Sequence, residues 1–139
     1  YMRAPKLKGL QFWAVIRTLL ENCKNVQEAL EYITGMPIAY NINLMLLDKT
    51  GNAALVETLD GAVAIKRIFP DSPEQILWAT NHALLPELAE REPKAFKHSV
   101  RRHNCIADQL AKNTSETTEK QKEMLPSKNP NGLCCHDFK

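Results

Sequence analysis

The alternation of apolar and polar residues predicts two amphipathic helices near the beginning of the chain. The first is expected over roughly residues 10–23, where apolar side chains recur at helical spacing. The second should begin at Asn25, a good N-cap with Glu28 at the capping-box position. Gly35 and Pro37 should end it, Gly35 as a left-handed cap and Pro37 as a residue that cannot continue a helix.

Beyond residue 39 the pattern becomes that of β-strands. Residues 43–47 form a run of mostly apolar side chains, which is expected of a strand covered on both faces. Asp60-Gly61 is a strong signal for a two-residue hairpin. The strands predicted for an antiparallel meander are 43–47, 53–57, 62–69 and 76–79. A third helix should begin near Ser99, and residues 133–136 look like the start of another strand. The sequence therefore predicts an α+β fold, an antiparallel meander with flanking helices.

Composition and charge narrow the class of protein. A chain of 139 residues fits one domain, and its net charge of +2 is too small to indicate a nucleic acid or an anionic membrane surface as partner. No apolar run approaches the roughly 20 residues that a membrane span needs. The four scattered cysteines, which suggest no disulfide framework, are Cys23, Cys105, Cys134 and Cys135. A reducing cytoplasm is therefore the expected location, and no phosphate-binding motif or cofactor is indicated.

The stretch WATNHALLPE, residues 78–87, carries the most interesting polar side chains. Thr80-Asn81-His82 stands directly behind a short apolar run, where a buried strand would reach the surface. An Asn amide can donate a hydrogen bond to an oxyanion without a proton transfer, but Asn also commonly caps strands and starts turns. His82 is open to two interpretations as well, a hydrogen-bonded structural residue and a base.

The order of short motifs along the chain resembles a known family. The segments that carry this resemblance are Gly9-Leu10, Arg17 to Glu21, Ala29-Leu30, Pro37, Asn43 to Gly51, Val56-Glu57, Thr80-Asn81-His82, Ser99 to Arg102 and Cys134 to His136. In this order, which spans nearly the whole chain, they are similar to the penicillin acyltransferase-like peptidases (peptidase C45-type). These are N-terminal nucleophile hydrolases that cleave linear amides.

The resemblance implies an αββα sandwich of four layers and an N-terminal cysteine, freed by self-cleavage, that is both nucleophile and base. It also implies an Asn after a central strand that holds the oxyanion, and this Asn maps onto Asn81. The nucleophile maps onto no residue, because the chain begins Tyr1-Met2 and Cys23 lies in a helical stripe. The arginine that often stands inside the terminal motif is Cys135 here. We therefore expect residues 1–139 to be a single domain that is a fragment of a larger N-terminal nucleophile hydrolase domain.

The leading hypothesis is a portion of a cysteine amidohydrolase or acyltransferase that acts on linear amides or acyl thioesters. The catalytic thiol would come from outside this chain, and Asn81 would donate to the oxyanion. His82 would hold the loop that positions Asn81. Arg102 would pair with an acidic group of the fold or bind a substrate carboxylate, unless it is an exposed residue in the first turn of its helix. Glu57 is expected to be a strand-end or turn partner, and Asp48 a turn residue that bonds its own backbone.

The expected partners are a small acyl amide or thioester and the remainder of a longer chain, with neither nucleic acid nor membrane; a homo-oligomer is left open. Two other hypotheses stay in view. The first is a non-catalytic module of the same architecture that binds a small acyl ligand or a protein. The second is a small redox or metal protein that uses Cys134 and Cys135 beside His136.

Overall fold

The computed structural model describes residues 7–92 and 95–112, and the chain divides into two compact units after Lys94. The elements of the first unit are α1 (Phe12–Asn22), α2 (Val26–Thr34), β1 (Asn43–Leu47), β2 (Ala53–Leu59), β3 (Ala62–Ile68) and α3 (Pro86–Ala89). The described part of the second unit contains α4 (Lys97–Lys112), which begins two residues before the expected Ser99. The expected strand at 133–136 lies outside the described residues.

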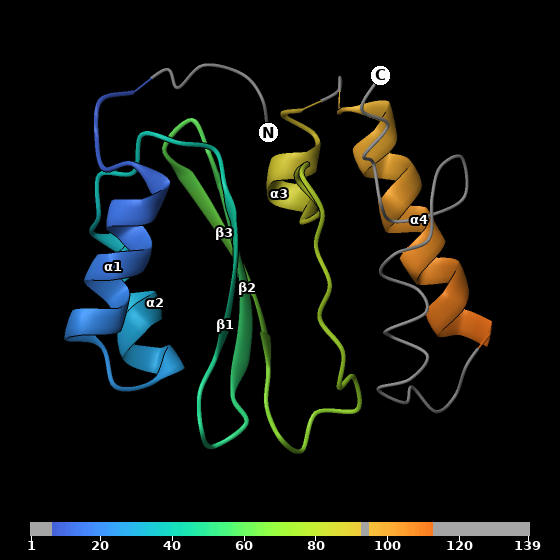
Figure 1. Ribbon diagram of the computed structural model, residues 1–139, viewed down its shortest axis with the longest axis horizontal. Helices are drawn as coiled ribbons and strands as arrows, with labels where there is room; N and C mark the ends of the chain where they lie inside the picture. Colours follow the sequence, from blue (N-terminus) through green and yellow to red (C-terminus); the bar gives the residue numbers. More distant parts are fainter. Residues whose placement is uncertain (1–6, 93–94, 113–139) are drawn as a thin grey trace, which may run out of the picture. The chain divides into compact units, whose positions relative to one another are not determined.

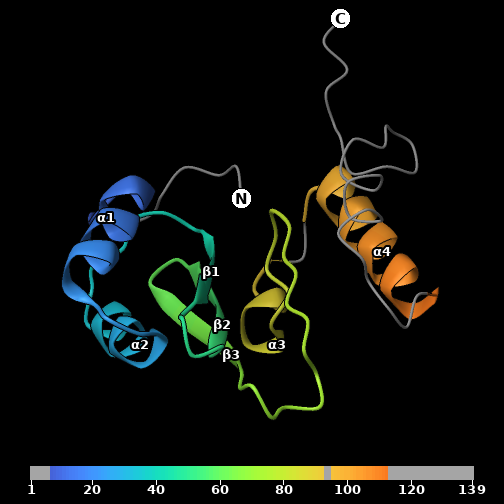
Figure 2. The same cartoon turned by 60° about the horizontal axis from the view of Figure 1, so that its bottom comes forward.

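The first unit is a layered α+β arrangement. Its sheet has the order β1-β2-β3 with antiparallel neighbours, as the meander predicts. Figure 1 shows α1 and α2 against one face of this sheet, and Figure 2 shows α3 and the segment that precedes it against the other. The Asp60-Gly61 hairpin is confirmed, because both residues have a positive φ, 49° and 84°, as a two-residue turn of this kind requires. Of the four layers that the resemblance implies, the described residues of the first unit contain one sheet and the helical layer formed by α1 and α2.

The predicted fourth strand is wrong. Residues 76–79 belong to no strand, because the chain crosses the face of the sheet instead of pairing along its edge. Turns begin this path: the backbone N–H of Ser72 donates to the carbonyl oxygen of Phe69, and the side chain of Gln75 donates to the carbonyl oxygens of Phe69 and Pro70. Side chains of the sheet then hold the chain over the face, as described below. Helix α3 was also not expected, although Pro86 at its first position is a recognised start signal.

Apolar side chains fill the space on both sides of β2. On the helix side, the buried cluster is Val15, Leu19, Val26, Ala29, Leu30, Ile33, Ile38, Ala54 and Val56. On the opposite side, the buried cluster is Leu59, Ala64, Ala83 and Leu88. The sequence suggested that β1 is covered on both faces, and this expectation is wrong. The strand that is covered on both faces is β2. Strand β1 lies at the edge of the sheet, and its Met45 and Leu47 are 58% and 76% exposed on the side away from the helices.

Helix α2 begins as the sequence predicts, but its C-terminal end differs from the prediction. The Asn25 side chain accepts a hydrogen bond from the backbone N–H of Glu28 at 2.9 Å, so the predicted N-cap is confirmed. Gly35 is not in the left-handed region, since its φ is −95°. The Thr34 hydroxyl contacts the carbonyl oxygens of Leu30 and Glu31 at 3.0 and 2.8 Å. The hydroxyl hydrogen of Thr34 is thus available to a carbonyl of the last turn, a part of the helix where a left-handed glycine cap would place backbone N–H groups.

Asp48 joins the β1–β2 turn to α2. Its carboxylate accepts hydrogen bonds from the backbone N–H groups of Thr50 and Asn52, at 2.9 and 3.2 Å, which confirms the expected turn role. It also accepts from the backbone N–H of Val26 at 3.2 Å, the first residue of α2. The hydrogen bond from the Thr50 hydroxyl, together with those from these backbone groups, holds the pKa of Asp48 well below its usual range. A carboxylate in this position also complements the positive end of the helix.

The Asp48→Asn variant should unfold at a lower temperature than the wild type at neutral pH, because the variant loses the ionised acceptor. A pKa that is lowered by folding contributes stability above the unfolded value of about 3.9 and loses it as the pH falls below that value. The wild type should therefore lose stability between about pH 5 and pH 2, and Asp48→Asn should lose less over the same range. Thermal unfolding at several pH values, with the exposed Asp71→Asn as control, measures this. Equal pH dependence in the wild type and Asp48→Asn would contradict it.

Within the ranges 7–92 and 95–112, no helix combines the length and the apolar character that crossing a bilayer requires.

Candidate active site

The segment 80–85, here called the Asn81 loop, lies over the face of the sheet that the first two helices leave uncovered (Figure 1). Two side chains of the sheet bond directly to its backbone. They are Asn43 of β1 and Glu57 of β2, which are Cα partners in the antiparallel ladder. Because partners in a ladder project on the same face, one cross-strand pair reaches both ends of the loop.

Glu57 is fully buried, with 0% of its surface exposed. Its two carboxylate oxygens both accept from the backbone N–H of Leu84 at 2.9 Å, and Oε2 also accepts from that of Leu85 at 2.9 Å. Burial, and to a smaller extent the negative charges of Glu92 and Glu87, raises the pKa of Glu57, while the two N–H donors oppose this rise. A buried carboxylate thus binds the backbone of a loop 27 residues further along the chain.

The expectation that Glu57 stands at a strand end is wrong. It lies inside β2, on the face that also carries Leu55 and Leu59, two buried apolar residues. An acidic residue at an inward position of an apolar strand needs hydrogen-bond donors nearby. The sequence shows the acidic residue among apolar ones, but it does not show which groups donate hydrogen bonds to Glu57.

Asn43 binds the other end of the loop. Its Nδ2 donates to the carbonyl oxygens of Thr80 and His82, at 2.9 and 2.8 Å, and these two residues flank Asn81 in the sequence. The sequence gives no signal for this role, because Asn43 stands at the beginning of the mostly apolar run 43–47. A further contact comes from Glu92, whose carboxylate accepts from the backbone N–H of Ala83 at 2.9 Å.

Asn81 itself is exposed at the tip of this anchored segment. His82 is buried, with 8% of its surface exposed, and its ring Nδ1 lies 3.0 Å from the hydroxyl oxygen of Thr80. The side chain of His82 therefore packs inward and braces the loop, while the backbone on both sides of Asn81 is fixed by Asn43. This arrangement can present a carboxamide to solvent with little freedom of the backbone beneath it.

Arg102 belongs to the second unit. It is half-buried in the second turn of α4, so the alternative of an exposed residue in the first turn is wrong. Its expected role toward a substrate carboxylate stays a prediction.

Within the described parts of the chain, the cysteines are Cys23 and Cys105, and both are half-buried. Cys23 follows the last residue of α1, and burial, with the nearby charge of Glu28, raises the pKa of its thiol. A raised pKa disfavours the nucleophilic thiolate, in agreement with the view that Cys23 is not the nucleophile.

No group of three or more His, Cys, Asp and Glu side chains that could hold a metal ion occurs among residues 7–92 and 95–112. Cys134, Cys135 and His136 lie outside these ranges.

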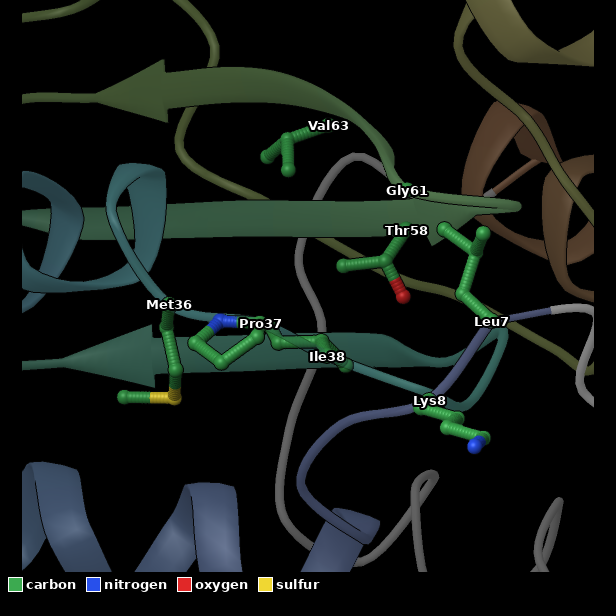
Figure 3. A pocket seen from close by; sticks show the side chains of 8 residues that line it. All are labelled: Leu7, Lys8, Met36, Pro37, Ile38, Thr58, Gly61 and Val63. Atoms are coloured by element: carbon green, nitrogen blue, oxygen red, sulfur yellow. The ribbon is translucent and has the colours of Figure 1, made fainter.

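A cavity of about 280 Å³ lies on the other side of the sheet (Figure 3). Its lining is mainly apolar: Leu7, Lys8, Met36, Pro37, Ile38, Thr58, Gly61 and Val63. The Thr58 hydroxyl is already used, because it donates to the carbonyl oxygen of Tyr40 at 2.8 Å and accepts from the N–H of Ile42 at 3.1 Å. Thr58 alternates with Glu57 along β2, so this cavity and the Asn81 loop lie on opposite faces of the sheet.

The layered α+β unit, a three-stranded antiparallel sheet with α1 and α2 against one face, is consistent with part of an N-terminal nucleophile hydrolase fold. Residues 1–139 match the family described as acyl-coenzyme A:6-aminopenicillanic acid acyl-transferase, and the chain belongs to this family. The resemblance drawn from the sequence motifs is thereby confirmed. No curated protein and no solved structure matches the chain.

The backbone N–H groups of Leu84 and Leu85 should be protected from hydrogen exchange, because their acceptor is a buried carboxylate. We expect both amides to exchange at least roughly tenfold more slowly, after correction for intrinsic rates, than those of the exposed residues Glu74 and Gln75. Hydrogen–deuterium exchange followed by NMR measures this. Exchange of Leu84 and Leu85 as fast as that of Glu74 would show that the carboxylate does not hold the loop in solution.

Proposed function

We propose that this chain forms part of a cysteine N-terminal nucleophile acyltransferase or amidohydrolase, in which the Asn81 side chain stabilises the oxyanion. The observation that carries the proposal is the anchoring of the Asn81 loop. An exposed carboxamide stands on a backbone that is bonded on both sides to Asn43, and further along to Glu57. Donors of this kind contribute most when they are fixed before the reaction begins. Membership of an acyltransferase family supports the same reading.

The proposed reaction passes through an acyl-enzyme. A cysteine thiolate, which the described residues do not supply, attacks the carbonyl carbon of a thioester or amide, and the carbonyl electron pair moves onto the oxygen. The Asn81 Nδ2 donates a hydrogen bond to this oxyanion. Collapse of the tetrahedral intermediate re-forms the carbonyl and breaks the bond to the leaving thiolate or amine, with a proton passing to the amine. An incoming amine or water then attacks the acyl-enzyme, gives up a proton and releases the thiol.

The family description supports a substrate class. It names an acyl-coenzyme A, which is a thioester donor, and 6-aminopenicillanic acid, which is a primary amine that also bears a carboxylate. We propose that the donor here is an acyl thioester or a linear amide and that the acceptor is a small amine or water. Arg102 would bind an acceptor carboxylate through its guanidinium. His82 would contribute by bracing the loop through its contact with Thr80.

Replacing Asn81 with Ala in the full-length enzyme should lower kcat/KM by on the order of a hundred- to a thousandfold, the usual cost of losing one oxyanion donor. The variant should still fold, because Asn81 is exposed and the bonds from Asn43 and Glu57 to the loop backbone do not involve its side chain. The measurement combines steady-state kinetics with thermal unfolding, using acyl-coenzyme A and 6-aminopenicillanate as the first substrates. Asn104→Ala removes an exposed carboxamide from α4 and serves as the matched control. Turnover by Asn81→Ala equal to that of Asn104→Ala would remove Asn81 from the mechanism.

Replacing Arg102 with Lys should raise KM for an acceptor that carries a carboxylate by roughly tenfold, because an ammonium cannot form the paired hydrogen bonds of a guanidinium. KM for an amine of similar size without a carboxylate should stay within about twofold. The two acceptors are compared with the same acyl donor. Equal changes for both acceptors would assign Arg102 a structural role instead of a binding role.

A further inference from the structure

We propose that Asn43 and Glu57 act together as positioning residues for Asn81. In this proposal, one cross-strand pair of the sheet determines the position and orientation of the oxyanion donor. This inference rests on the proposed function of Asn81. Neither side chain has to touch the substrate. Their contribution would be made through the backbone of the Asn81 loop.

Asn43 controls the peptide groups on both sides of Asn81. Its single Nδ2 group donates to the carbonyl oxygens of residues 80 and 82, so both of its hydrogens are engaged by the loop. The Asn43 Oδ1 is buried and has no hydrogen-bond partner among the described residues. The donor end of this amide is therefore the end that the fold uses. One hydrogen bond on each side of Asn81 fixes the direction of the chain at that residue, and hence the direction of its Cα–Cβ bond.

Glu57 holds the same loop three residues further on. Without its carboxylate, the N–H groups of Leu84 and Leu85 would have to find another acceptor at a position where Glu57 itself has no exposed surface. Leaving such donors unpaired costs free energy, and a loop that moves to satisfy them carries Asn81 with it. Because Glu57 and Asn43 are Cα partners in the ladder, the rigid spacing of β1 and β2 also sets the spacing of the two anchors.

The proposed reaction requires that the Asn81 side chain be placed precisely. An oxyanion donor stabilises a charge that exists only in the transition state, and a misplacement of about 1 Å in an active site can cost a hundredfold in rate. The loop carries no regular secondary structure at residues 80–85. Its own backbone cannot supply that rigidity, so side chains of the sheet have to supply it.

A double-mutant cycle tests the inference in the full-length enzyme. Asn43→Leu keeps the approximate shape of the side chain and removes both donors, whereas Glu57→Gln keeps the shape and removes the charge. Each should lower kcat by about tenfold to a hundredfold and leave KM within about twofold. The reason is that each substitution would misplace the oxyanion donor and leave substrate binding intact. In the Asn81→Ala background, neither substitution should lower kcat further, because the donor that they position is already gone.

Met45→Gln is the matched control, since Met45 is exposed on the same face of β1 and should leave kcat unchanged. If Asn81→Ala lowers kcat but the two substitutions lower it by the same factor in both backgrounds, or do not lower it at all, the positioning role is overturned and the proposed function stands. If Asn81→Ala itself leaves kcat unchanged, both fail together. If Glu57→Gln does not fold, as thermal unfolding would reveal, the cycle with Asn43→Leu alone decides the outcome.

Discussion

A buried carboxylate and the backbone N–H groups that it binds determine how the first unit is put together on the face of the sheet away from α1 and α2. Glu57 has no exposed surface, and the donors that it needs come from Leu84 and Leu85. Burying a charge without such donors would be costly. The chain after β3 is therefore drawn across the face of the sheet (Figure 1). Asn81 is exposed, and the carbonyl oxygens of the residues on both sides of it accept from Asn43.

The rest of the unit serves as support for that interaction. The helices cover the opposite face through an apolar cluster around Val15, Ile33 and Val56. Asp48 ties the turn at one end of the ladder to the beginning of α2. Strand β2, buried on both sides, is held between these layers, and its position fixes Glu57. Side chains of the sheet can in this way hold a loop that has no regular secondary structure in one position.

The sequence predicted the local features of the fold well. The N-cap at Asn25, the hairpin at Asp60-Gly61 and the three strands each depend on residues close together in the chain. The errors arose where distant groups decide the structure. Residues 76–79 have the composition of a strand, but hydrogen bonds from Asn43 and Glu57 to the segment that follows draw the chain over the face of the sheet. Periodicity contains no information about such partners. Asn81 is a candidate because its chemistry and the family motif agree, whereas Asn43 and Glu57 bind the loop through hydrogen bonds that only the three-dimensional arrangement shows.

The most direct measurement of the central claim is a crystal structure of the full-length enzyme with an aldehyde analogue of the acyl donor, which forms a tetrahedral adduct with the catalytic thiol. The account predicts that the adduct oxygen lies about 2.7–3.1 Å from the Asn81 Nδ2, with the bonds of Asn43 and Glu57 to the loop unchanged. An adduct oxygen held by other donors, with the Asn81 side chain turned away toward its own loop, would contradict it.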